Sequence, residues 1–196
     1  MRQISCRSKA TLATAVMLVG METRAEQNPA SQADNPGQLP VRRIVISLTE
    51  CKLALLENGV VAKIYHVAVG APASPSPVGI YEIANRIELP TYYAPGKIIA
   101  PGLDNPLGTR WIGISIKGFG IHGTNRPKSI GKAASHGCIR LRNRDVEELF
   151  RIVREGDVVE LHAQSSEELA GIFAANPPAA SGQASRAGTV ITPASR

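Results

Sequence analysis

The stretch that decides the fold and the chemistry is HGTNRPKSIGKAASHGCIRL, residues 122–141. It places Cys138 in a tight Ser-His-Gly-Cys turn and a second histidine, His122, sixteen residues upstream in His-Gly-Thr. A thiol becomes a nucleophile near neutral pH only when a base and a polar environment assist it. Gly123 and Gly137 leave room for a substrate carbonyl to approach the backbone closely. The stretch therefore predicts a nucleophilic cysteine.

Two histidines are candidates for the base that takes the proton of the Cys138 thiol. His122 is our first choice. His136 is separated from Cys138 by one residue, and residues i and i+2 share a face of an extended segment, so proximity alone does not exclude it. An imidazole with an ordinary pKa near 6.5 would make the rate depend on pH between about 6 and 8.

The same turn offers donors for an oxyanion and for a substrate carboxylate. An acyl-enzyme reaction needs an oxyanion hole, and the backbone N–H groups of His136, Gly137 and Cys138 are the local candidates. Arg140 shares a face with Cys138 on an extended strand, and its guanidinium suits a carboxylate. A structural ion pair is the alternative for Arg140. Ser135 has either a structural role, holding the turn through its hydroxyl, or a catalytic one.

A metal site is a weaker interpretation of the same residues. His122, His136 and Cys138 offer three possible ligands. The sequence has no C-x-x-C or H-E-x-x-H spacing, and no carboxylate lies within the His-Gly-Cys turn. We therefore expect neither a metal nor a cofactor.

Four groups of residues occur in an order typical of one family: PSPVGIY at 75–81, NPLG at 105–108, HGT with SHGCIRL between 122 and 141, and NRDVEEL at 143–149. This ordered set resembles the L,D-transpeptidase catalytic domain, the YkuD-like family of bacterial cell-wall enzymes. The similarity extends from about Arg43 to Leu161. Where the family often has Pro-Thr-Trp, this chain has Pro-Thr-Tyr at residues 90–92.

The resemblance implies a role for each residue of the site. It makes Cys138 the nucleophile and His122 the base, with the Gly123 carbonyl orienting the imidazole and His136 shaping the turn and lining the cleft. It implies that the thiolate attacks the L,D peptide bond of a peptidoglycan tetrapeptide stem and releases the terminal D-alanine. A side-chain amine of a second stem then attacks the thioester, which gives a cross-link. It also implies that carbapenem-type β-lactams acylate Cys138.

Other functions remain open at this point. Hydrolysis by water would make the protein an L,D-carboxypeptidase, or an enzyme that releases wall-attached protein, and a wall-anchored protein is a further possible acyl acceptor. All of these use the same Cys/His pair, so the residues do not separate them. A non-catalytic wall-binding module is the rival of another class, and the intact pair argues against it. We expect a monomer.

Short strand patterns separated by turns predict a mainly β fold, an antiparallel barrel or sandwich, with one short helix after the cysteine turn. Asn58-Gly59 between apolar runs is a strong hairpin signal. Residues 89–107 are rich in proline and glycine and are expected to form a wall or lid of the cleft; a surface excursion without a role is the alternative. Strands are expected over the ranges 43–48, 52–56, 60–69, 78–88, 111–116 and 157–161.

One helix is clear from the spacing of its apolar residues after position 143. Asn143 is the expected N-cap, and Gly156 is placed to end the helix. A second short helix is expected over residues 165–175, because Ser165-x-x-Glu168 forms a capping box. Cys51 is expected as a buried small residue of an early strand, not bonded to Cys138.

The ends of the chain predict export and a single catalytic domain. Residues 1–25 have a basic start and a short apolar run before Thr23-Arg-Ala25, which predicts a cleavable signal and a periplasmic or cell-wall location. We expect a linker at 26–40, the catalytic domain at 41–163, and a short helix and disordered tail at 164–196. The net charge of +6, without a basic run interleaved with aromatic residues, is poor evidence for nucleic-acid binding.

Overall fold

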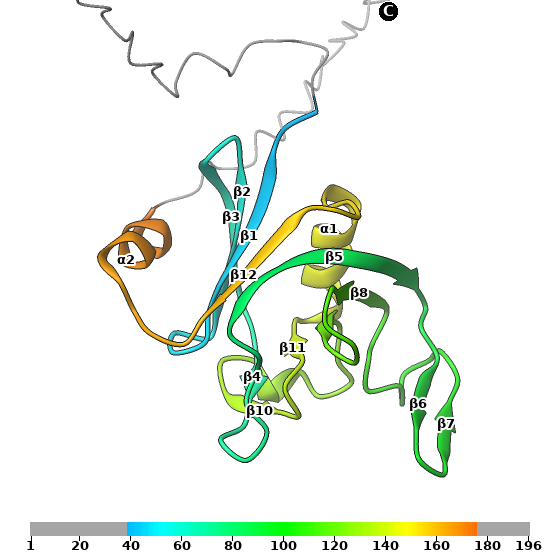
Figure 1. The fold of residues 1–196 in the computed structure, drawn as a ribbon. Coiled ribbons are helices and arrows are strands. Elements are labelled where there is room, and N and C mark those ends of the chain that lie inside the picture. Colours follow the sequence, from blue (N-terminus) through cyan, green and yellow to red (C-terminus); the bar gives the residue numbers. More distant parts are fainter. Residues whose placement is uncertain (1–38, 176–196) are drawn as a thin grey trace, which may run out of the picture. The chain divides into compact units, whose positions relative to one another are not determined.

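A curved sheet of eight strands, described here in a computed structural model, organises the protein (Figure 1). The structure describes residues 39–175; the predictions for the signal segment, for most of the linker and for the tail lie outside this range. The order in the sheet is β11-β9-β8-β5-β12-β1-β2-β3. The strands are β1 (Arg42–Ser47), β2 (Lys52–Glu57), β3 (Val60–His66), β4 (Val69–Gly70), β5 (Gly79–Glu88), β6 (Tyr92–Ala94), β7 (Lys97–Ile99), β8 (Arg110–Ile114), β9 (Gly120–His122), β10 (Ala133–Ser135), β11 (Ile139–Arg140) and β12 (Val158–His162). The helices are α1 (Asn143–Ile152), α2 (Glu167–Ala174) and a short 3-10 helix (Pro127–Ser129).

The predicted hairpin is confirmed at its turn. Strands β2 and β3 pair antiparallel on either side of Asn58 and Gly59. These two residues have φ angles of 50° and 80°, as a two-residue turn of this hand requires. The turn chemistry therefore sets the register of β2 against β3 next to the turn.

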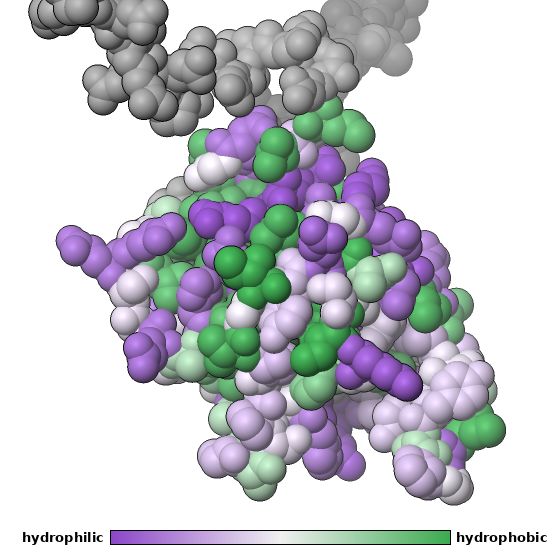
Figure 2. Space-filling view, in the orientation of Figure 1, coloured by the Kyte–Doolittle hydropathy of each residue, from purple (hydrophilic) through white to green (hydrophobic). Residues whose placement is uncertain are grey.

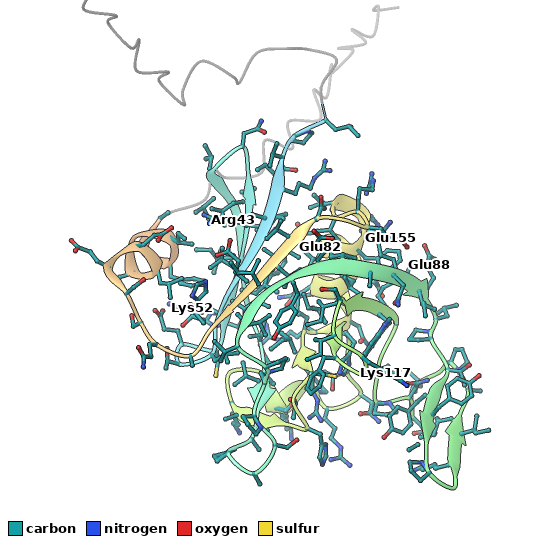
Figure 3. The ribbon with its side chains drawn as sticks, viewed as in Figure 1. Arg43, Lys52, Glu82, Glu88, Lys117 and Glu155 are labelled. Carbon is teal, nitrogen blue, oxygen red and sulfur yellow. The ribbon has the colours of Figure 1, made fainter. Side chains whose placement is uncertain are left out.

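The mainly β class is confirmed, and the pairings show that the sheet is mixed. Strand β12 lies between β1 and β5, antiparallel to β5 and parallel to β1. Strand β11 likewise runs parallel to β9. Arg43 of β1, labelled in Figure 3, forms an ion pair of 3.1 Å with Glu160 of β12. The last strand of the domain therefore connects the first hairpin with the strands that carry the cysteine turn.

The core lies on both faces of β1 and β2. Ile44 and Ile46 of β1 belong to a large cluster that includes Val146 and Leu149 of α1. Val45, on the opposite face, packs in a second cluster with α2. Both faces of this part of the sheet are thus covered by a helix, which explains why β1 and β2 carry nearly continuous apolar runs.

The outer face of β5 is different in character. Its exposed apolar residues include Ile80, which is 74% exposed, and Val78 just before the strand. Figure 2 shows apolar side chains in the middle of the viewed face, surrounded by polar ones. None of the helices in residues 39–175 combines the length and the hydropathy needed to cross a membrane.

Four local predictions need correction. Helix α1 ends at Ile152 with Val153 as its C-cap, and not at Gly156. The N-cap of α1 is Arg142, and Asn143 is the first helical residue, without a side-chain capping bond. The second helix is capped one residue later than expected, since the Ser166 hydroxyl accepts from the N–H of Leu169. Cys51 is in the turn before β2 and is only partly buried; it is a free thiol, as is Cys138.

Candidate functional site

Two short parallel strands bring the candidate residues together. Strand β11 pairs with β9 so that Arg140 lies opposite His122 and Ile139 opposite Ile121. Cys138 immediately precedes β11, and the backbone of Gly120 lies within hydrogen-bonding reach of its thiol. His122, Ser135, His136, Cys138 and Arg140 all line one cavity of about 420 Å³. A pairing between segments sixteen residues apart therefore assembles the site.

The thiol of Cys138 is partly buried and protonated at rest. Its Sγ donates to the carbonyl of Gly118 at 3.6 Å. Burial raises the pKa of the thiol above its ordinary value, while the Gly120 backbone and the charge of Arg140 act in the opposite direction. Burial is the largest of these effects, so the reactive thiolate has to be generated with the help of a base.

The imidazole of His122 is buried and held by the backbone. It is 4% exposed, and its Nδ1 lies 2.6 Å from the carbonyl oxygen of Gly123. A carbonyl only accepts, so Nδ1 carries the proton and Nε2 of the neutral ring carries the lone pair. The ring also stacks on Trp111, with centroids 5.8 Å apart and planes inclined by 21°.

Burial determines the protonation state of His122. It lowers the pKa from 6.5 to about 4, against the raising effects of the Gly123 and Leu107 backbones, and the charge of Arg140 lowers it further. The resting pair is thus a neutral thiol and a neutral imidazole. The pH dependence expected between 6 and 8 from an ordinary histidine therefore moves down to about pH 4.

Ser135 fixes the turn that presents the thiol. Its hydroxyl donates to the carbonyl of Cys138 at 2.5 Å and accepts from the N–H of Gly137 at 3.0 Å. Gly137 has φ of +108°, and a Cβ there would lie 2.6 Å from the ring of Phe119. The structure therefore supports the structural role for Ser135. Because the Gly137 N–H is engaged, the N–H groups of His136 and Cys138 are the remaining candidates for oxyanion donors.

Basic side chains dominate the charge of the cavity. Arg140 donates to the carbonyl of Ala134 at 3.2 Å, and no carboxylate forms a salt bridge with it among residues 39–175. Arg126 and Lys97 also line the cavity, with Asp104 as its acidic residue. Sequence reasoning missed Arg126 and Lys97. Arg126 follows His122 by four residues in the same stretch, which is the signal that was available.

The proline-rich loop forms a wall of this cavity, as predicted. Strands β6 and β7 form a hairpin within it, and Tyr92, Ile99 and Leu107 face the site. Asn105 holds the loop together: its buried amide donates to the carbonyls of three loop residues, Pro90, Ile99 and Ala100. A single buried amide thus shapes a long segment with little regular structure.

The two histidines differ sharply in their surroundings. His136 is exposed on the cavity wall, whereas His122 is buried and oriented by a carbonyl. Within the described part of the chain, no group of three or more His, Cys, Asp or Glu residues is arranged to hold a metal ion. The arrangement suits proton transfer between an imidazole and a thiol.

Comparison with known proteins agrees with this arrangement. A family model described as the L,D-transpeptidase catalytic domain matches residues 41–161. The chain belongs to this family. YkuD of Bacillus licheniformis, whose name assigns it to the L,D-transpeptidases, is 41% identical over 127 residues, which cover 65% of this chain and 68% of that protein. YqjB of Bacillus subtilis, named in the same way, is 38% identical over a region that covers 58% of this chain and 66% of YqjB.

Solved L,D-transpeptidases share the fold. A structure from Mycobacterium tuberculosis superimposes with a TM-score of 0.55 at 21% identity, over 63% of this chain and 58% of that one. A mutant of the Enterococcus faecium L,D-transpeptidase, with a cysteine replaced by serine, superimposes with a TM-score of 0.54 at 25% identity. The match covers 62% of this chain and 49% of that one. The chain thus spans about two thirds of the curated relatives and half to three fifths of the solved ones.

The buried His122 makes the stability of this L,D-transpeptidase domain depend on pH. As the pH falls below 6.5, the unfolded chain takes up a proton that the folded protein does not bind until about pH 4. We therefore expect the free energy of unfolding to decrease over this window, by roughly 3 kcal/mol on account of this histidine. Urea unfolding at pH 7 and pH 4.5 measures the loss, and His122→Gln should lack this component. An equal loss in wild type and variant would contradict the assignment.

Proposed function

We propose that this protein is a peptidoglycan L,D-transpeptidase that acts through an acyl-enzyme on Cys138. The observation that carries the proposal is the meeting of Cys138 and the backbone-oriented, neutral His122 in one cavity. Belonging to the L,D-transpeptidase family supports it as well. Family membership supports the substrate class, and geometry and protonation support the proposed roles of the residues.

The first half of the reaction transfers an acyl group to sulfur. Nε2 of His122 accepts the Sγ proton while sulfur attacks the carbonyl carbon of the L,D peptide bond. The resulting oxyanion is held by the N–H groups of His136 and Cys138, where each donor is worth about 2.7–4 kcal/mol of barrier. The C–N bond then breaks, and the departing amine of the D-amino acid takes the proton from His122. The product is a thioester on Cys138.

The second half returns the enzyme to its resting state. An amine of a second stem attacks the thioester carbon, and His122 accepts the proton that this amine loses. The C–S bond breaks, and sulfur takes the proton back from His122. Each proton removed from a nucleophile is thus delivered to a leaving group, so no cofactor is required.

The charge of the cavity supports a substrate with free carboxylates. Arg126, Arg140 and Lys97 line it together with only one acidic residue, Asp104. A guanidinium presents a planar fork that matches a carboxylate, and peptidoglycan stems carry carboxylates next to the bond that is cleaved. We infer that these cations hold the donor stem with its scissile carbonyl near Cys138.

A covalent adduct of a structural relative supports acyl transfer. A solved relative that is 26% identical, with a TM-score of 0.55 over 64% of this chain, is described as the carbamoyl enzyme of Ldtfm with avibactam. We propose that carbapenem-type β-lactams likewise acylate this protein, on Cys138. Such compounds provide a chromogenic or mass-based readout of the first half-reaction.

Incubation with purified disaccharide-tetrapeptide tests the function directly. We expect mass spectrometry to detect dimers whose mass is that of two monomers less one released D-alanine. Cys138→Ala should give no product. Tripeptide without dimer would show hydrolysis and overturn the transpeptidase assignment in favour of an L,D-carboxypeptidase. No product from the wild type, with the fold intact, would overturn both.

Location and partners follow from the same proposal. Its substrate lies outside the cytoplasmic membrane, so we propose an exported protein of the periplasm or cell wall that acts as a monomer. A wall-anchored protein is a second acceptor that the acyl-enzyme would permit. Cell fractionation tests the location, and a cytoplasmic protein would contradict it.

A further inference from the structure

The side-chain amide of Asn143 lies where three motif segments meet. Its Oδ1 accepts a hydrogen bond of 2.9 Å from the N–H of Thr124. A Cβ atom on Gly108 would lie 2.1 Å from this oxygen, and a Cβ on Gly123 would lie 2.3 Å from it. Glycine at both positions therefore leaves the space that the amide occupies. Asn143 thus packs against the NPLG and HGT segments from the first turn of α1.

A rigid element carries this amide. Asn143 is the first residue of α1, and its side chain does not cap the helix. Val146 and Leu149 anchor the helix in the core, where both are fully buried. A side chain on an anchored helix keeps its place better than one on a loop. The helix therefore provides a fixed point for the loop that follows His122.

The hydrogen bond to Asn143 acts on the peptide group that orients the imidazole. The carbonyl of Gly123 and the N–H of Thr124 belong to one planar trans peptide group and point in opposite directions. The carbonyl accepts a hydrogen bond from the Nδ1–H of His122, and the N–H donates to Oδ1 of Asn143. Because glycine permits many backbone conformations, Gly123 by itself does not fix the rotation of this group. Asn143 supplies the constraint.

Rotation of this peptide group would reverse the roles of the two ring nitrogens. The N–H of Thr124 would then face Nδ1, which would have to accept, and the neutral ring would carry its proton on Nε2. A protonated Nε2 cannot take a proton from a thiol. We propose that Asn143 is a positioning residue that holds the His122 proton on Nδ1 and keeps Nε2 basic. This inference rests on the proposed role of His122 as the base.

The tautomer of His122 is measured by ¹⁵N NMR of the imidazole nitrogens. Wild type is expected as the Nδ1–H form. Asn143→Ala and Asn143→Leu, which lack the acceptor, should convert a substantial fraction to the Nε2–H form. Their β-lactam acylation should slow in proportion to the fraction of the ring that keeps a basic Nε2, by about 10-fold when about nine tenths is converted. The Gly123 carbonyl raises the pKa of His122. Loss of the hydrogen bond to this carbonyl should therefore also move the fall in rate at acid pH (the acid limb) to lower pH.

Two further variants separate positioning from stability. Asn143→Asp keeps an acceptor oxygen and should keep the wild-type tautomer and most of the rate. Arg144→Ala changes the next residue of the same helical turn, whose side chain is 78% exposed and pairs with Asp145, and should resemble wild type in both readouts. Asn143→Leu fills the same space as the native side chain. If Asn143→Ala does not fold, Asn143→Leu is compared with Asn143→Asp instead.

The inference is overturned if folded Asn143→Ala or Asn143→Leu retains the Nδ1–H tautomer and the wild-type acid limb. It is equally overturned if Asn143→Asp changes the tautomer as much as Asn143→Leu does. The NMR readout needs no turnover. A protein that shows the expected tautomers but forms no product from muropeptides would therefore disprove the proposed function and leave the positioning role intact.

Discussion

Cys138→Ser is expected to form no acyl-enzyme with a carbapenem, while its fold is unchanged. A hydroxyl is smaller than a thiol and fits in its place, so the turn held by Ser135 should tolerate the change. The pKa of a hydroxyl is much higher than that of a thiol, and a buried imidazole with a pKa of about 4 is too weak a base to compensate. Loss of a nucleophile typically lowers the rate by on the order of 10⁶-fold. Mass spectrometry of the intact protein measures the adduct.

Cys51→Ser is the matched control, because Cys51 is the other free thiol of the described residues. It is in a turn before β2 and does not line the cavity of the site. The control should carry one adduct, as the wild type does, and its acylation rate should be unchanged. An adduct on Cys138→Ser, or turnover of stem peptides by it, would assign the nucleophile to another residue.

His122→Gln is expected to slow acylation by about 10²–10⁴-fold, the usual contribution of a general base. The wild-type rate should be flat above about pH 5 and fall as the pH drops through about 4, because protonation of His122 removes the base below that value. An alkaline limb should appear above the ordinary pKa of 9.0, since burial raises the pKa of the thiol. Rates measured from pH 3.5 to 10 test both limbs, and His122→Gln should lack the acid one.

His136→Gln distinguishes the two histidines. Its side chain is exposed on the cavity wall, so the change should alter the affinity for the β-lactam more than the pH profile. The acid limb near pH 4 should persist in this variant. If His136→Gln loses the limb and His122→Gln keeps it, the roles assigned to the two residues are reversed.

Local signals made the hairpin and the cysteine turn predictable from the sequence. Asn58-Gly59 has positive φ at both positions, as such a turn needs, and Gly137 has positive φ next to Cys138. Turn conformations of this kind depend on a few neighbouring residues, so the sequence alone predicts them. The cleft-forming role of the proline-rich loop was also accessible, because a long loop without regular structure inside a small domain is usually functional.

Features that depend on distant partners were not predictable in the same way. Asparagine is a residue type favoured at helix N-caps, but the amide of Asn143 lies in the space that Gly108 and Gly123 leave open. The parallel pairing of β1 with β12 joins the two ends of the domain, which no local pattern indicates. The low pKa of His122 depends on burial by the surrounding chain. In each case tertiary contacts override or complete the local preference.

The position of β12 has a consequence for how the domain folds. Without this strand, the sheet consists of two separate parts, β1–β3 on one side and β5, β8, β9 and β11 on the other. The ion pair of Arg43 with Glu160 closes a loop of 117 residues, and contacts so distant in sequence form slowly. The cysteine turn precedes β12 in the chain. We therefore expect the sheet beside the cysteine turn to be completed late in folding, when β12 pairs with β1 and β5.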